Sequence, residues 1–269
     1  MRFKVVLTLN TNMSGNVLPI SYQYELSSAI NRILTEDNVR YLNWLSINGL
    51  TEEDAVQQKL YSLSNLYVPR LYVHEDRMTI NVPRVQFWIS FHHTINTEEY
   101  VNSALLAHDL VLGDRKSRVH FTVESIEPVT PVEFKETMVY QSISPVTVIA
   151  IRANNSVEYL EPSNPFFGQF LVEELIERWE RLNRMPYEGD RHFRFHTLIT
   201  PKRKAVTVKS GTPMQKKVIS YMIKFELSMD PMLQELAYDL GVGNKIHQGF
   251  GYIELLYKLA HTVFLHSYL

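Results

Sequence analysis

RFKVVLTLN (residues 2–10) and YQYELSSAINRILT (residues 22–35) stand near the start of the chain, and their order indicates the fold. Apolar and polar residues alternate in the first stretch, a pattern typical of a half-buried strand. In the second stretch the apolar residues recur at helical spacing, at Leu26, Ile30, Ile33 and Leu34. The chain therefore begins with a strand followed by an amphipathic helix.

The segments that follow continue this alternation of strands and helices. A second helix is predicted over 97–108, and strict alternation over 116–126 predicts the strand after it. Between the two helices the sequence predicts strands over 61–74, 77–82 and 84–91, the first two joined as a hairpin. The order is β-α-β-β-α-β, which is the ferredoxin-like unit.

The same order returns after Pro128 and Pro131. The predicted elements are strand material over 137–151, a long helix over 167–182, basic strands within 192–227, a helix that Asp230 caps and Pro231 opens, and a last strand over 250–255. The sequence thus predicts an α+β protein with two tandem ferredoxin-like domains. Their boundaries are residues 1–128 and 129–256, followed by a C-terminal extension over 257–269.

The composition excludes several classes of protein. The 269 residues include no cysteine, so disulfides, thiolate zinc sites and iron–sulfur clusters are excluded. No apolar run is long enough to suggest a membrane span, and the N-terminus does not resemble a signal peptide. We therefore expect a cytoplasmic protein with no membrane partner. The 27 Lys and Arg oppose 29 Asp and Glu, and a net charge of −2 by itself argues against a uniformly basic nucleic-acid binder.

The distribution of charge is more informative than its sum. Residues 191–225 contain no Asp or Glu, and the remaining chain carries 18 cations against all 29 acids. An acid-free stretch of this length is unusual for a solvated face and favours a surface that binds a polyanion. The nine cations in it are Arg191, Arg194, Lys202, Arg203, Lys204, Lys209, Lys216, Lys217 and Lys224.

The local pattern predicts how this basic surface is built. Phe193 and Phe195 alternate with polar residues, which predicts a strand with its phenylalanines facing the core. Residues 200–204 are predicted to form an exposed hairpin tip, and 211–213 a second turn. We therefore expect two adjacent antiparallel hairpins that display the nine cations together.

A glycine-rich segment, GVGNKIHQGFG (residues 241–251), precedes the last predicted strand. It matches neither the P-loop nor the dinucleotide-binding pattern. A helix end and a tight turn need one or two glycines, whereas this segment has four of the chain's ten. With Lys245 and His247 between them, the segment is predicted to meet phosphate or an RNA backbone. The four glycines are Gly241, Gly243, Gly249 and Gly251.

With this motif the sequence resembles the CRISPR-associated endoribonucleases that process precursor CRISPR RNA, members of the repeat-associated RNA-binding superfamily. The N-terminal strand, the 112–114 segment, the 200–227 strands and above all the glycine-rich segment carry the resemblance, which extends over about residues 1–255. It implies two ferredoxin-like domains with an RNA-binding cleft, and CRISPR repeat RNA as the partner. The predicted RNA-binding residues are eight of the nine cations, all except Lys224, together with the four glycines and Lys245.

The resemblance also implies metal-independent cleavage, in which the RNA 2′-hydroxyl attacks its own phosphate and leaves a 2′,3′-cyclic phosphate and a 5′-hydroxyl. Many members of the family use a histidine in or just after the first helix, but this chain has no histidine before His74. The usual position falls on Ser46, or less well on Asn43, and neither side chain titrates near neutral pH. His247 is the best remaining candidate for catalysis. The weaker candidates are Tyr41, Tyr22, Tyr24 and Lys59.

Three interpretations of the sequence follow. The leading one is an endoribonuclease that needs no metal and no cofactor. The alternative is a non-catalytic RNA-binding member that acts as a structural subunit of a CRISPR ribonucleoprotein. A metal-dependent nuclease is poorly supported, because no cluster of acids and histidines stands at ligand spacing. Other subunits of a CRISPR effector complex and, through the apolar extension, a second copy of the chain are the further partners considered.

Overall fold

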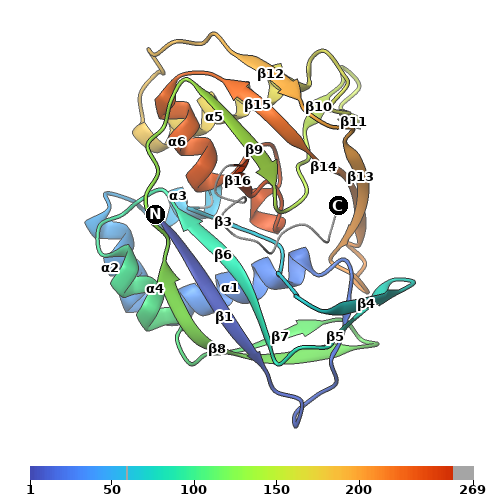
Figure 1. The fold of residues 1–269 in the computed structure, drawn as a ribbon. Coiled ribbons are helices and arrows are strands. Elements are labelled where there is room, and N and C mark those ends of the chain that lie inside the picture. The colour runs from blue at the N-terminus through green and yellow to red at the C-terminus, as the bar shows by residue number, and fades with distance from the viewer. Residues whose placement is uncertain (59, 257–269) are drawn as a thin grey trace.

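The structure, a computed structural model, describes residues 1–58 and 60–256. It is an α+β protein with two halves, each built on an antiparallel sheet, as Figure 1 shows with the N-terminal half below and the C-terminal half above. The predicted C-terminal extension, residues 257–269, lies outside the described residues. In the described part of the chain no helix has the length and the apolar character needed to cross a membrane.

The N-terminal half has a five-stranded sheet in the order β3-β6-β1-β8-β7. Its first strand lies in the middle, with Phe3 opposite Ile89 on one side and Val5 opposite Ile126 on the other. The strands of this sheet are β1 (Arg2–Leu9), β3 (Tyr61–Leu63), β6 (Arg84–Phe91), β7 (Asp109–Gly113) and β8 (Arg118–Pro128). A separate three-stranded sheet contains β2 (Val17–Pro19), β5 (Arg77–Ile80) and β4 (Leu71–His74).

The helices of this half pack their apolar stripes on the main sheet. The expected helix near the start is α1 (Gln23–Glu36), which buries Leu26, Ile30 and Ile33 against Phe3, Leu7 and their neighbours. The second expected helix is α4 (Thr97–Leu105). Two further helices, α2 (Asn38–Ile47) and α3 (Glu52–Gln58), were not predicted, because their short apolar stripes are hard to distinguish from a loop.

The C-terminal half repeats the arrangement with a four-stranded sheet in the order β12-β15-β9-β16. Again the first strand is central, with the last strand on one side of it and the third strand on the other. The strands are β9 (Thr137–Ser142), β12 (Arg194–Thr197), β15 (Lys224–Ser228) and β16 (Ile253–Leu255). The helices are α5 (Phe167–Asn183) and α6 (Pro231–Leu240), and the Asp230 carboxylate accepts a hydrogen bond from the Met232 amide as its cap.

Two small hairpins complete this half. One joins β10 (Ile149–Ile151) to β11 (Val157–Tyr159). The other joins β13 (Lys202–Val208) to β14 (Lys216–Met222), and we call it the basic hairpin. Its buried side chains Val206, Val208 and Val218 pack on Phe250, with Tyr24 of α1 at the edge of the same cluster. The basic hairpin therefore rests on both halves of the molecule, at the right of Figure 1.

The prediction of two adjacent basic hairpins was wrong in its pairing. The strand at 194–197, β12, pairs with β15 rather than with β13. Along the chain, the basic hairpin is therefore inserted between two paired strands of another sheet. Lys202, Arg203 and Lys204 lie within a strand and not at a turn, and the tip of the hairpin falls at 209–215. Local alternation identifies strands but not their partners, and the core contacts of Phe195 and Phe225 decide this pairing.

The hairpin expected from residue 61 also differs from the prediction. Only β4 and β5 form it, and they join β2 outside the main sheet, whereas β3 pairs with β6 inside the sheet. The apolar residues over 61–74 conceal this change of sheet, because Leu63 of β3 is buried whereas Tyr72 and Val73 of β4 are apolar but exposed.

Candidate nucleic-acid interface

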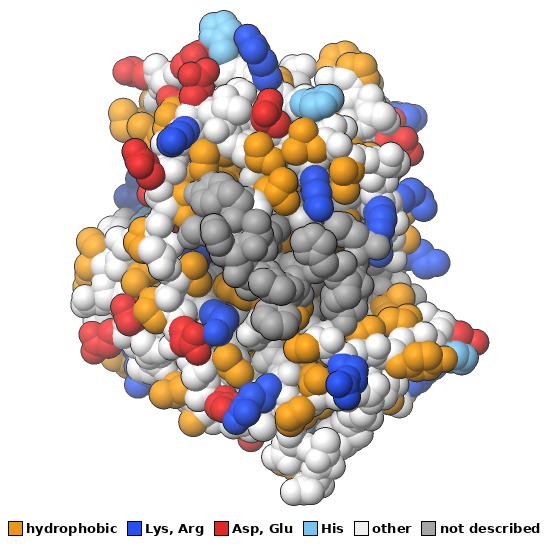
Figure 2. Space-filling view, viewed as in Figure 1, with side chains coloured by type: hydrophobic (Ala, Val, Ile, Leu, Met, Phe, Trp, Pro, Cys, Tyr) orange, Lys and Arg blue, Asp and Glu red, His pale blue; other side chains and the backbone are white. Residues whose placement is uncertain are grey.

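The basic hairpin carries its cations at the two strand ends and at its tip, beyond its buried valines. Lys202, Arg203, Lys204, Lys216 and Lys217 are exposed, and Lys209 is half-exposed. Among the residues that the structure describes, none of these six cations forms an ion pair. Figure 2 shows Lys and Arg side chains gathered at the right edge of the upper half, over β13 and β14. This surface is positive and has no internal acid to neutralise it.

The other cations of the acid-free stretch lie elsewhere, so the nine are not displayed together as predicted. Arg191 forms an ion pair with Glu180 of α5 at 3.1 Å, and its guanidinium stands over the ring of Tyr187. Arg194 is exposed on β12, beside the groove at the start of α5. Because β12 pairs with β15 and not with β13, Arg191 and Arg194 lie away from the basic hairpin. Their binding to RNA stays a prediction.

One cation of the N-terminal half joins the basic hairpin. Arg115 lies in the exposed turn between β7 and β8, and its Nε is 4.0 Å from the place where a Cβ on Gly211 would stand. Gly211 belongs to the hairpin tip. The sequence contained no signal for this neighbour, because Arg115 and the tip are about a hundred residues apart.

The glycine-rich segment packs tightly between the halves. All four of its glycines are buried with positive φ. A Cβ at Gly243 would stand 2.4 Å from the Thr147 carbonyl oxygen, and one at Gly249 would stand 2.6 Å from the Gln23 carbonyl oxygen on α1. The spare glycines that suggested a ligand therefore have a packing role. Their contact with RNA stays a prediction.

A buried arginine stabilises the glycine-rich segment through hydrogen bonds to its backbone. Arg178 of α5 donates to the carbonyl oxygens of Gly241 at 2.9 Å and Gly243 at 3.1 Å. Asn244 supports the same turn, because its side-chain oxygen accepts from the Ile149 amide at 2.7 Å and its amide nitrogen donates to Glu174 at 3.1 Å. Arg178 lies in the predicted long helix, where nothing in the sequence marks it as different from an exposed arginine.

Lys245 brings the glycine-rich segment into the basic surface. It has left-handed backbone with φ 61° and is half-buried. Burial, and then the charge of Lys216 on the basic hairpin, lower the pKa of the Lys245 ammonium. A bound anion would reverse the second effect, since it would compensate both ammonium groups.

His247 lies in the single 3-10 turn η1 (Ile246–Gln248) and its side chain is exposed. Its carbonyl oxygen accepts a hydrogen bond from Ser27 of α1 at 2.9 Å, and its ring Nε2 is 3.0 Å from the Gln248 side-chain nitrogen. The imidazole thus stands beside the first turns of α1, at the surface where the two halves meet.

The tyrosine candidate is placed differently. Tyr41 of α2 is half-buried, and its ring stacks on Tyr100 with centroids 6.5 Å apart. Burial, and then the nearby Glu52, raise the pKa of its hydroxyl, which disfavours a role as a base at neutral pH. Its part in catalysis stays a prediction. Ser46 and Asn43 are exposed on the same helix. The candidate Lys59 lies outside the described residues.

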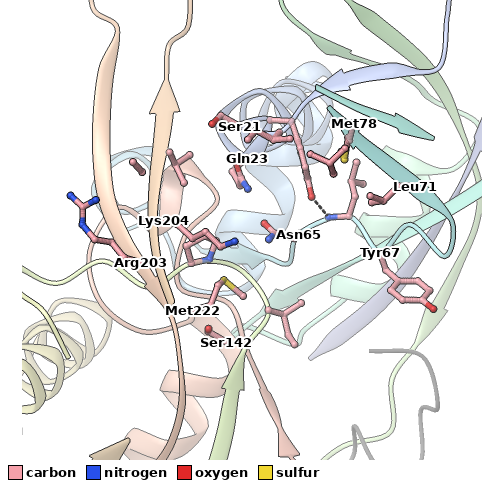
Figure 3. A pocket seen from close by; sticks show the side chains of 18 of the residues that line it. Ser21, Gln23, Asn65, Tyr67, Leu71, Met78, Ser142, Arg203, Lys204 and Met222 are labelled. Atoms are coloured by element: carbon pink, nitrogen blue, oxygen red, sulfur yellow. Dashed lines mark hydrogen bonds between the residues drawn. The ribbon is translucent and has the colours of Figure 1, made fainter. Parts of the chain in front are cut away.

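A cavity of about 400 Å³ lies between the two halves, next to the basic hairpin. Figure 3 shows side chains of both halves around it. Tyr22 and Gln23 line it from the start of α1, Asn65 and Tyr67 from the segment after β3, and Lys204 from β13. In the described part of the chain no group of three or more histidine or acidic side chains could hold a metal ion.

The C-terminal half matches a known protein family. Residues 127–255 match the family model described as CRISPR associated protein Cas6, C-terminal. This stretch contains the basic hairpin and the glycine-rich segment. The C-terminal half of the chain therefore belongs to the Cas6 family of CRISPR-associated proteins.

Solved structures extend the likeness to both halves. A CRISPR associated protein Cas6 has 21% sequence identity and a TM-score of 0.72, covering 95% of this chain and 99% of that one. A Cas6-related protein from Pyrococcus furiosus has 19% identity and a TM-score of 0.75, covering 95% and 98%. A RAMP protein described as binding different RNA substrates has 20% identity and a TM-score of 0.73, covering 95% and 99%. At such identities the likeness establishes a shared fold. No curated protein matches this chain by sequence.

Proposed function

We propose that this protein binds CRISPR repeat RNA across the junction of its two halves. The observation that carries the proposal is the basic hairpin, with its six cations free of ion pairs among the described residues and Lys245 beside them. A cation that already has a carboxylate partner gains little from a phosphate, whereas an unpaired one releases counterions from the RNA when it binds. Membership of the Cas6 family supports CRISPR RNA as the polyanion.

The same proposal includes the architecture expected from the sequence. Each half is taken as a ferredoxin-like domain, with boundaries at residues 1–128 and 129–256. Support comes from the equivalent strand orders of the two sheets, in which the first strand is central, flanked by the third and fourth, with the second outside the third. The strand β7 is an addition at the edge of the first sheet.

Salt titration of RNA binding tests the proposal. Labelled repeat RNA from the organism's own CRISPR array is bound to the protein at a series of salt concentrations. For five to seven phosphate contacts, log Kd should rise with log salt with a slope of about 3.5–5 on single-stranded RNA. A flat salt dependence, or no binding at low salt, would contradict the proposal.

Cleavage of the bound RNA is a second candidate function, favoured by the position of His247. Its exposed imidazole lies on η1 beside α1 and close in sequence to Lys245, so a proton-transfer group and a cation border the same surface. In this reaction the 2′-oxygen attacks phosphorus and the bond to the 5′-oxygen breaks. The imidazole would accept the 2′-hydroxyl proton or donate a proton to the leaving 5′-oxygen.

The His247→Ala variant separates binding from cleavage. In EDTA and with saturating protein, we expect the wild type to give a cyclic-phosphate end, and the variant to cut at least a hundredfold more slowly with unchanged affinity. His192→Ala, which removes an exposed histidine before β12, serves as the matched control. If wild-type protein binds without cutting, the function is RNA binding alone; unchanged cleavage by His247→Ala would remove this histidine from the mechanism.

A further inference from the structure

The cavity between the halves has polar groups that the fold leaves unsatisfied. Gln23 Oε1 and Asn65 Oδ1 are both buried, and neither accepts a hydrogen bond from any described residue. Gln23 as a whole is only 7% exposed. A buried acceptor without a donor destabilises the fold, so two among the residues that line one cavity point to a ligand with two donors.

The backbone that carries these two side chains is held in place by neighbouring segments. Gln23 is the first residue of α1, and its carbonyl oxygen packs against Gly249 of the glycine-rich segment. Asn65 lies next to Leu66, whose amide donates to the Tyr22 hydroxyl at 2.8 Å, the hydrogen bond drawn in Figure 3. The two side chains therefore start from backbone positions that are fixed before any ligand arrives.

A third polar group enters the same space from the C-terminal half. Figure 3 shows Lys204 directed toward Asn65 and Gln23, whereas its neighbour Arg203 is directed away from them. The Lys204 ammonium is a donor and can accept no hydrogen bond. The cavity thus offers two acceptors on one side and a charged donor beside them.

The remaining lining is apolar and suits a flat ring. Leu71 and Met78 come from the β4–β5 hairpin, Met222 from the end of β14 and Tyr67 from the segment after β3. Aromatic and thioether side chains are the usual faces on which unpaired bases stack. A cavity of about 400 Å³ is large enough for one base and its ribose.

We propose that this cavity binds one unpaired guanine base of the repeat RNA, with Gln23 and Asn65 accepting from its N1–H and N2–H groups and Lys204 donating to its O6. Guanine is the base whose single edge has two adjacent donor groups next to an acceptor. Adenine and cytosine have one amino group each, and uracil has one imino group. This inference rests on the proposed RNA binding. It adds one position at which the protein distinguishes guanine from the other bases.

Short RNA probes test this without changing the protein. The probes are fluorescein-labelled heptamers U3-X-U3 with X as guanine, adenine, cytosine, uracil, inosine or 7-deazaguanine, and binding is measured by fluorescence anisotropy. We expect guanine to bind at least tenfold more tightly than the other three standard bases. Inosine lacks the N2 amino group and should lose about tenfold, whereas 7-deazaguanine keeps the whole edge and should bind like guanine.

Variants then connect the preference to the cavity. Gln23→Met and Asn65→Leu keep the side-chain size and remove the acceptors, so each should reduce the preference for guanine over uracil to about threefold or less, with the affinity for the all-uracil probe unchanged. Gln169→Met, an exposed glutamine of α5, is the matched control and should keep the full preference.

The outcomes separate this inference from the proposed function. Equal affinity for all probes, with steep salt dependence, would overturn the guanine site and leave RNA binding intact. Preference for another base, or tight binding of inosine, would also overturn it. Failure of every heptamer and of the repeat RNA itself would overturn both proposals.

Discussion

Cations at two places in this molecule are treated in opposite ways. At the junction of the halves, the Arg2 side chain is 2% exposed, pairs with Glu254 at 3.0 Å and lies with its guanidinium carbon 3.2 Å from the Tyr238 ring centroid. It also donates to the Tyr238 carbonyl oxygen. On the basic hairpin, by contrast, Lys216 and Lys217 are exposed and form no ion pair with any described residue.

The difference teaches which charges maintain the fold and which are available for a partner. A buried guanidinium is tolerated only when other groups compensate its charge, and Arg2 connects β1 to α6 and β16 through Tyr238 and Glu254. Exposed and unpaired lysines contribute little to stability. Their placement on one surface has no structural reason within the described chain, which favours an external anion.

The largest expected effect is on stability, from Arg2→Met. Removal of the cation leaves the Glu254 carboxylate and the Tyr238 carbonyl group buried without their partner, and unfolding should become easier by about 3–5 kcal/mol. Lys4→Met on the same strand is the control: Lys4 pairs with Glu127 at 2.7 Å but is 31% exposed, so its loss should cost under about 1 kcal/mol. Urea unfolding measures both, and equal losses would contradict the comparison.

The next effect is on RNA affinity, from Lys216→Glu with Lys217→Glu. Two reversed charges at a phosphate-binding surface should weaken repeat RNA binding about 30-fold, or about 2 kcal/mol, and lower the salt slope by about 1–2. The melting temperature should not fall. Arg191→Glu with Arg194→Glu reverses two charges of the same acid-free stretch away from the basic hairpin and should change affinity less than threefold. An equal loss in the two pairs would mean that the whole stretch binds RNA.

The smallest expected effect is on the melting temperature, from Glu25→Gln. It extends the comparison from cations to a half-buried carboxyl group. Burial raises the pKa of the half-buried Glu25 from 4.5 to about 7, and its Oε2 has no hydrogen-bond partner among described residues. A raised folded-state pKa contributes stability below pH 4.5 that is lost as the pH rises through 7. Glu25→Gln should therefore raise the melting temperature at pH 8 by about 2–4 °C and leave it nearly unchanged at pH 4.5.

Glu98→Gln, on an exposed position of α4, is the control for this pH effect and should change the melting temperature equally little at both pH values. A similar gain for Glu25→Gln at pH 4.5 and pH 8 would show that the carboxyl group does not titrate between these values.

Several features were readable from the sequence because they depend on local periodicity or on composition. The helical spacing of Leu26, Ile30 and Ile33 predicted α1, and Asp230 before Pro231 predicted the cap of α6. The absence of acids over 191–225 identified the basic stretch before any fold was known. The glycine-rich segment indicated the family, and its match over 127–255 agrees with that.

Other features depend on which strands meet, and local pattern does not contain that information. Strand pairing placed Lys216 and Lys217 on the basic hairpin but moved Arg191 to Glu180 at the far side of α5. The helix α2 was missed because its propensity is weak and tertiary packing of Trp44 and Leu45 stabilises it.

The sequence by itself determined the helices α1, α4, α5 and α6, the segregation of charge and the resemblance to the family, since each is a property of neighbouring residues. Only the tertiary structure decided that Arg178 would hold the glycine-rich segment, that Arg115 would reach the hairpin tip, and that Gln23, Asn65 and Lys204 would share a cavity. The physical reason is burial. Whether a polar side chain is paired, or is left with an unsatisfied acceptor, depends on contacts between residues far apart in the chain.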